Sequence, residues 1–146
     1  MPPLDTSQAP RISIADFRQL LNDHHPFAAV LNAEIIDIGH GSATLLLTSN
    51  GHHERLGGII AGPMLMGLAD LALYAAVVGA TGNPEAVTAS LSINFLRKTP
   101  PGGVKAFAAV HKTGRLTAGD VLLVPADGGA PVAQAISTWS LPRPKA

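Results

Sequence analysis

The sequence predicts an α+β fold in which one long apolar helix is wrapped by a curved antiparallel sheet of about five or six strands. Two features of the chain predict it. Residues 57–78 form an apolar run that holds a single charge, Asp70, and residues 28–49 and 87–139 contain extended segments separated by short turns. A helix that is apolar on nearly all sides must be covered on most of them, and strands joined by short turns pair as antiparallel neighbours.

The length and composition of the chain fit one domain with a sizeable core. Its 146 residues are 47% hydrophobic and 14% charged, with zero formal net charge and no cysteine. We expect a single domain over residues 1–146, in which the proline-rich residues 1–11 form a loose arm. Zero net charge argues against nucleic acid or a membrane surface as a partner, and scarce charge favours self-association. The absence of cysteine fits a reducing compartment, so we expect a cytoplasmic location.

The first part of the chain predicts a short helix followed by a hairpin. Ser13 with an acid at Asp16 is typical of a capped helix N-terminus, so we expect a helix from residue 14 to about residue 22. The His-His-Pro sequence at 24–26 ends it. Residues 28–38 and 41–49 are extended stretches joined by a Gly-His-Gly turn, which predicts a hairpin.

The central helix is predicted to begin at Gly62-Pro63, after a polar, histidine-rich loop. Proline is tolerated in the first turn of a helix because its missing N–H has no intrahelical partner there. Two glycines, a proline and a carboxylate within one apolar run argue against a membrane span. We therefore expect a buried helix that carries Asp70 about two turns from its start.

Four further strands are predicted after the helix. Residues 87–95 alternate strictly between apolar and polar side chains, which is the period of a strand with one buried face. Residues 104–111, 117–125 and 131–139 follow at short spacing, and the last of them carries Trp139, which we expect in the core or at an interface. Strands spaced by such short turns predict an antiparallel meander. Four histidines, at positions 24, 25, 40 and 111, are expected at the surface or in turns.

The order of elements and the local sequence resemble the hotdog-fold thioesterases, most closely the phenylacetate-degradation-type (PaaI-like) acyl-CoA thioesterases. The resemblance covers roughly residues 25–140. Members of this family carry a motif similar to H-x-N-x-x-G-x-x-H-G-G, followed by a helix with Leu-Ala-Asp. The matching positions in this chain are His53, Gly58, Gly62, Leu68-Ala69-Asp70, Val87-Thr88, Gly114-Arg115 and 132–135.

The resemblance implies roles for three catalytic residues. Asp70 is then the carboxylate that activates water or attacks the thioester directly, the Gly62 N–H holds the oxyanion, and Thr88 assists across a dimer interface. The residues themselves fit this chemistry, because an acid among apolar neighbours has a raised pKa and a helix N-terminus favours negative charge. The alternative is that Asp70 only caps or pairs within a dimer, with Arg55 or a histidine as its partner.

The chain departs from the family motif at Arg55, Ala61 and Pro63, where members have Asn, His and Gly. Arg55 is open to three interpretations: it binds a carboxylate or phosphate, it pairs with Asp70 and lowers the pKa of that acid, or it is a solvated loop residue. His53 is expected to position the loop, and His52 or His53 to take over the proton role lost at Ala61. Adjacent histidines rarely bind one ion, so we expect no metal site.

Five basic residues fall in a stretch without an acid, between Glu85 and Asp120. They are Arg97, Lys98, Lys105, Lys112 and Arg115. A local positive rim attracts the phosphates of coenzyme A, although such residues also serve as a solvated edge that discourages strand aggregation. Together with the motif, this gives the expected substrate-binding set of His53, Arg55, Gly58, Ala61, Pro63, Arg97, Lys98 and Arg115.

These observations favour a homodimeric or homotetrameric acyl-CoA thioesterase with its sites at the subunit interface. Coenzyme A enters as part of the substrate, and no metal or redox cofactor is expected. Two alternatives remain at this point. The altered motif fits a catalytically weak protein that binds an acyl-CoA or another acyl ligand, and the fold also fits a purely structural assembly module.

Overall fold

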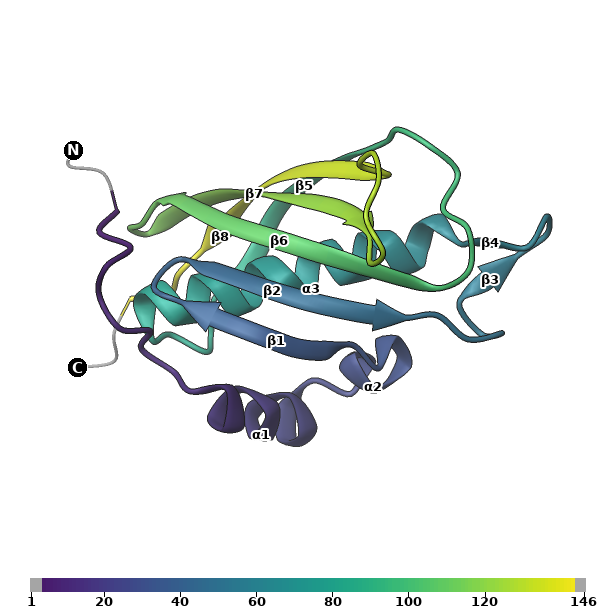
Figure 1. Cartoon of the computed structure of the whole chain (residues 1–146). Helices are drawn as coiled ribbons and strands as arrows, with labels where there is room; N and C mark the ends of the chain where they lie inside the picture. Colours follow the sequence, from purple (N-terminus) through teal and green to yellow (C-terminus); the bar gives the residue numbers. More distant parts are fainter. Residues whose placement is uncertain (1–3, 144–146) are drawn as a thin grey trace.

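The computed structural model describes residues 4–143. Its elements follow in chain order: α1 (Ile14–His24), α2 (Phe27–Leu31), β1 (Glu34–Gly39), β2 (Ser42–Thr48), β3 (Glu54–Arg55), β4 (Ile59–Ile60), α3 (Gly62–Thr81), β5 (Val87–Phe95), β6 (Gly103–Lys112), β7 (Leu116–Pro125) and β8 (Ala133–Ser140). The long helix α3 lies along the concave side of the main sheet, and α1 and α2 lie beside β1 (Figure 1). The predicted α+β class, with one central apolar helix and an antiparallel sheet, is confirmed.

The main sheet has six strands in the order β1-β2-β6-β7-β8-β5, and every neighbouring pair is antiparallel. Strands β6, β7 and β8 form the predicted meander. The prediction is wrong for β5, which pairs with β8 at the edge of the sheet instead of with β6. The connection at 96–102 carries the chain from β5 at the edge of the sheet to β6 in the middle. Closeness along the chain therefore did not make β5 and β6 neighbours in the sheet.

Helix α3 begins and ends where the sequence places it. Pro63 occupies its first turn, and Gly82 ends it in the left-handed region with φ 68° while its N–H bonds the Val78 carbonyl. A Cβ atom at Gly79 would lie 2.3 Å from the Gly39 carbonyl oxygen, so glycine lets α3 approach the backbone of β1 closely. Within residues 4–143, α3 alone is long and apolar enough to cross a membrane, but 67% of that apolar window is buried inside the fold.

The first helix is confirmed, but the segment after it is not extended from residue 28. The Ser13 hydroxyl caps α1 by accepting from the Asp16 N–H at 3.1 Å. Residues 27–31 form the short helix α2, because Pro26 already has helical dihedrals and Asn32 closes the turn with φ 51°. The strand predicted over 28–38 therefore begins only at Glu34. The hairpin of β3 and β4 was also missed, since two-residue strands leave no periodicity to read.

The described part of the N-terminal arm, residues 4–11, forms turns and irregular chain; residues 1–3 of the predicted arm lie outside the described residues. This part is nevertheless attached to the fold. The Arg11 N–H bonds the Gly79 carbonyl at 2.8 Å, and Leu4 packs against the core beside Gly41. The arm therefore closes over the end of the sheet where β1 turns into β2.

Candidate active site

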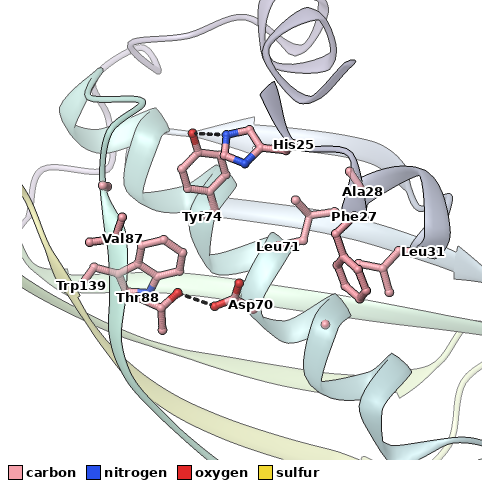
Figure 2. Close-up of a pocket in the computed structure, with 12 residues that line it drawn as sticks. His25, Phe27, Ala28, Leu31, Asp70, Leu71, Tyr74, Val87, Thr88 and Trp139 are labelled. Carbon is pink, nitrogen blue, oxygen red and sulfur yellow. Dashed lines mark hydrogen bonds between the residues drawn. The ribbon is translucent and has the colours of Figure 1, made fainter. Parts of the chain in front are cut away.

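Asp70 is held by Thr88. Asp70 lies on α3 two turns from its start, and Thr88 lies at the beginning of the edge strand β5. The Thr88 hydroxyl donates to Asp70 Oδ1 at 2.6 Å (Figure 2). This bond fixes one carboxylate oxygen and leaves the other free to accept a proton. The sequence predicted both residues as catalytic but expected Thr88 to assist from the partner; that part is corrected, because the structure bonds Thr88 to Asp70 within one chain.

The environment of Asp70 raises the pKa of its carboxyl group above the ordinary value. Burial is the main cause, because it penalises the charged form, and the hydrogen bond from Thr88 acts in the opposite direction. The upward shift makes the ionised carboxylate a stronger base than an exposed aspartate. This is the electrostatic condition for a general base that works near neutral pH.

Asp70 and Thr88 line a mostly apolar cavity of about 240 Å³, which we call the Asp70 cavity (Figure 2). The walls come from α2, α3, the start of β5, and β8. The lining residues are His25, Phe27, Ala28, Leu31, Gly67, Asp70, Leu71, Tyr74, Ala86, Val87, Thr88 and Trp139. A cavity with apolar walls and one carboxylate at its side fits an acyl group whose carbonyl carbon lies beside the acid.

One end of the Asp70 cavity is polar and aromatic. The Tyr74 hydroxyl donates to the Pro84 carbonyl at 2.6 Å and lies 3.1 Å from His25 Nε2. Trp139 stacks on Tyr74 with ring centroids 5.7 Å apart, is only 2% exposed, and has an indole nitrogen without a hydrogen-bond partner in the described chain. His25 is partly buried and lines this cavity, whereas His40 lies in the predicted turn between β1 and β2 and is only 5% exposed there.

A second cavity of about 530 Å³ lies at the N-terminus of α3, and we call it the basic cavity. Three of the predicted basic residues line it, together with Gly62 and Pro63. The full lining is Arg55, Ile59, Ile60, Gly62, Pro63, Leu65, Phe95, Leu96, Arg97, Lys98 and Thr99, with no acid among them. Thr99 is 2% exposed, and its hydroxyl has no hydrogen-bond partner within residues 4–143.

Gly62 and Asp70 therefore lie in different cavities of one chain. Eight residues of helix separate them by about 12 Å. The first N–H groups of a helix have no acceptor within it, so the Gly62 N–H is free to bind a ligand atom. A Cβ atom at Gly62 would lie 3.3 Å from Phe95 Cζ, which places the end of β5 beside the start of α3.

The proposed ion pair between Arg55 and Asp70 does not form within one chain. Arg55 lies on β3 and lines the basic cavity, while Asp70 lines the other one. A contact of 2.8 Å joins His111 Nε2 to Asp120 Oδ2, and neither residue lines the Asp70 cavity or the basic cavity. The pKa of Asp70 is raised by burial, whereas a nearby guanidinium would have lowered it.

The histidine of the motif holds the loop in place. His53 is fully buried; its Nδ1 accepts from the Asn50 N–H, its Nε2 bonds the Val30 carbonyl at 3.0 Å, and its own carbonyl accepts from the Ala61 N–H. With both ring nitrogens engaged, it ties the loop to α2 and to the start of α3.

Gly58 lies at the exposed turn between β3 and β4 with φ 67°, and it lines neither cavity described above.

The predicted basic rim is divided between the two ends of the sheet. Arg97 lies beside the start of β8, where its Nη1 donates to the Pro131 carbonyl at 2.5 Å, and Lys98 follows it. Arg115 lies beside the end of β8, since its carbonyl accepts from the Leu141 N–H. The length of β8 separates these ends by about 23 Å. Arg97 and Lys98 share a cavity with Arg55, and Arg115 does not belong to it.

Within residues 4–143, no three His, Asp or Glu side chains gather as a metal site would require. His52 and His53 are adjacent in sequence, and His53 is committed to backbone partners. The residues that line the two cavities thus offer one carboxylate, several cations, hydroxyl groups and a helix N-terminus. Such a set fits hydrolysis of a polarised carbonyl compound by activated water.

Comparison with known proteins identifies the class. Residues 57–118 match the model of the Thioesterase superfamily. A candidate thioesterase from Silicibacter sp. TM1040 is 30% identical, with 96% of each chain covered and a TM-score of 0.79. Thioesterase superfamily member 2 of zebra fish is 26% identical over 88% of this chain and 94% of its own, with a TM-score of 0.78. No curated protein matches the sequence significantly.

A variant of the phenylacetic acid degradation protein PaaI from Thermus thermophilus is 25% identical, covers 80% of this chain and 99% of its own, and has a TM-score of 0.72. The chain belongs to the thioesterase superfamily. Within it, the chain is a hotdog-fold, PaaI-like thioester hydrolase. The resemblance drawn from the motif is thereby confirmed.

Sequence reasoning did not predict that His25, Tyr74 and Trp139 meet at one end of the Asp70 cavity. His25 and Tyr74 are far apart in the chain and meet only because α1 and α3 pack together, and Trp139 joins them from β8. No spacing of residues along the chain predicts such a cluster. The one available signal was the presence of Tyr74, a residue with a polar hydroxyl, on an otherwise apolar helix four residues after Asp70.

Proposed function

We propose that this protein hydrolyses an acyl-CoA, with Asp70 as the catalytic carboxylate. The observation that carries the proposal is the 2.6 Å hydrogen bond from Thr88 to a half-buried Asp70 beside an apolar cavity. A carboxylate held in this way has one free oxygen, a raised pKa and a neighbouring space for an acyl group. The substrate's apolar part occupies the Asp70 cavity, and its charged part lies outside.

The reaction requires one water molecule per thioester. Asp70 takes a proton from the water molecule while the water oxygen attacks the carbonyl carbon. The Gly62 N–H, at the positive end of the helix, holds the resulting oxyanion. The carbon–sulfur bond then breaks, and the protonated Asp70 returns its proton to the departing thiolate. The products are a carboxylic acid and coenzyme A. Direct attack by Asp70 would instead give an anhydride that water hydrolyses, with solvent oxygen entering Asp70.

A second copy of the chain is needed to bring Gly62 to Asp70. β5 is an edge strand with one unpaired side, and Val87 and Phe95 at its two ends are 58% and 51% exposed. A nine-residue edge with exposed apolar side chains favours pairing with another strand. A homodimer that joins two β5 edges would remove this exposure, and we propose it as the active assembly.

This pairing explains the separation of the two catalytic groups. If two β5 strands pair antiparallel about their common midpoint, Leu91, then Thr88 lies opposite the partner's Asn94, and Val87 opposite the partner's Phe95. Asp70 bonds Thr88, and Gly62 packs against Phe95. The Asp70 cavity of each protomer would then adjoin the basic cavity of its partner.

The basic cavity supplies the contacts for the nucleotide part of coenzyme A. Arg55, Arg97 and Lys98 line it without an acid, so its potential is positive. Guanidinium and ammonium groups bind phosphate oxygens by charge-assisted hydrogen bonds. In this arrangement the acyl group lies in one protomer, and the coenzyme A phosphates bind mainly to the other.

The proposal is tested with a panel of acyl-CoA substrates of short, medium and aromatic acyl groups, with detection of the free thiol. We expect turnover of at least one class well above the background rate. Thermal stabilisation of the protein by acyl-CoA without turnover would replace the enzyme with an acyl-CoA-binding protein. The absence of both would leave neither interpretation standing.

A further inference from the structure

The hydrogen bonds at the far end of the Asp70 cavity fix the proton on His25. A tyrosine hydroxyl has one hydrogen, and the Tyr74 hydrogen points to the Pro84 carbonyl, which can only accept. The contact of 3.1 Å between Tyr74 and His25 Nε2 therefore requires Nε2–H as the donor. Burial raises the pKa of Tyr74 to about 12, so the hydroxyl keeps its hydrogen over the physiological pH range.

This assignment leaves His25 Nδ1 as a bare acceptor. A neutral imidazole with its proton on Nε2 has a lone pair on Nδ1. Burial is the main cause that lowers the pKa of His25, with a smaller contribution from the nearby His24, so the neutral ring is favoured. No hydrogen bond to Nδ1 is made by any described residue, and Figure 2 shows this nitrogen on the side of the ring toward Tyr74 and Leu71, which line the cavity with His25.

The acceptor lies at a defined depth in the cavity. Tyr74 follows Asp70 by four residues, so its side chain lies about one helical turn, roughly 6 Å, further along α3. Between the two ends the walls are the apolar side chains of Leu71 and Ala28 and the stacked ring of Trp139. An acyl group with its carbonyl beside Asp70 therefore passes an apolar zone and then meets one acceptor that no described residue pairs with.

We propose that His25 is a specificity-determining residue whose Nδ1 accepts a hydrogen bond from the acyl group. This assignment rests on the proposed function, and it adds to it a substrate preference: acyl groups that carry a hydroxyl several bonds beyond the carbonyl. Tyr74 is a positioning residue, since it acts on the substrate only by holding the His25 tautomer. A substrate hydroxyl that reaches Nδ1 donates the hydrogen bond that water would otherwise donate to Nδ1. A methyl group at the same place displaces the water and leaves Nδ1 without a donor.

The test compares two acyl-CoA substrates of equal chain length, hexanoyl-CoA and 6-hydroxyhexanoyl-CoA, by their kcat/KM ratio. The wild-type protein is expected to favour the hydroxylated substrate by about tenfold. In His25→Phe, which keeps a flat ring without nitrogen, the ratio of the two kcat/KM values should fall to about one, whatever the absolute rate for hexanoyl-CoA. His25→Asn, whose amide reaches the position of Nδ1, should retain part of it.

Two controls separate the possible failures. His24→Phe changes the neighbouring exposed histidine, which does not line the cavity, and should leave the preference unchanged. Tyr74→Phe should reduce the preference because the ring proton is no longer fixed on Nε2. A wild-type protein that hydrolyses both substrates equally, or a preference that survives in His25→Phe, overturns the assignment and leaves the proposed function standing. No hydrolysis of any acyl-CoA overturns both.

Discussion

The two cavities of this chain differ in almost every physical property. The Asp70 cavity is lined by apolar and aromatic side chains and holds one carboxylate whose pKa is raised by burial. The basic cavity is larger, is lined by two arginines and a lysine, and opens at a helix N-terminus. In the proposed function the first activates water beside an acyl group, and the second holds the negative charge of coenzyme A. Neither cavity alone holds the complete catalytic set that we propose, which is why the proposed reaction takes place where two copies meet.

The largest effect is expected at the acid of the Asp70 cavity. Asp70→Asn keeps the shape of the side chain and an oxygen that accepts from Thr88, but it removes the base. We expect kcat/KM for acyl-CoA hydrolysis to fall about a thousandfold or more, with the oligomeric state unchanged in size-exclusion chromatography. Retention of full activity would show that the acid merely serves packing in this cavity.

The pH dependence of kcat/KM tests whether the pKa of Asp70 in its cavity is raised. Only ionised Asp70 can accept a proton, so kcat/KM should fall about tenfold per pH unit on the acid limb, with a midpoint above the ordinary aspartate value of 3.8. The bond from Thr88 lowers the pKa of Asp70, so Thr88→Val should move this midpoint to higher pH. An acid limb that does not move in Thr88→Val would contradict the assigned coupling.

The basic cavity should affect binding more than chemistry. Lys98→Ala is expected to raise KM for acyl-CoA severalfold, to leave kcat nearly unchanged, and to reduce the dependence of KM on salt, because an exposed phosphate contact is screened by ions. Arg18→Ala is the matched control, since it removes one exposed positive charge from α1, which contacts β1 at the sheet edge opposite to β5. Equal effects of the two variants would favour a diffuse electrostatic attraction over a local site.

The smallest effect concerns stability. The pKa of Asp70 is higher in the folded chain than in the unfolded one, so its ionisation opposes folding once the pH exceeds the unfolded value. Asp70→Asn should therefore stabilise the fold at pH 7 by about 0.5–1 kcal/mol, and this gain should disappear below pH 3. Urea unfolding at the two pH values measures it. A loss of stability at pH 7 would show that the carboxylate is needed for the fold.

The sequence predicted the parts of the fold that rest on local patterns. Pro63 and Gly82 bound α3, Ser13 caps α1, and the alternation from Val87 to Phe95 forms β5. The place of β5 in the sheet could not be predicted, because it depends on pairing with β8 across the whole domain. The same limit applies to the site. The motif indicated Asp70, Gly62 and Thr88. It could not indicate that Arg97 and Lys98 lie at one end of the sheet and Arg115 at the other, because this depends on the order of the strands.

The central claim, that Asp70 of one protomer acts with the partner's Gly62, is tested most directly by mixing two inactive variants. Asp70→Asn lacks the base, and Gly62→Pro lacks the N–H while proline remains tolerated in the first turn of a helix. If the two residues act across the interface, each mixed dimer contains one intact site. Random reassociation should then restore about a quarter of the wild-type activity, since half of the dimers are mixed. Mixed dimers without activity, verified by differential tags, would contradict the claim.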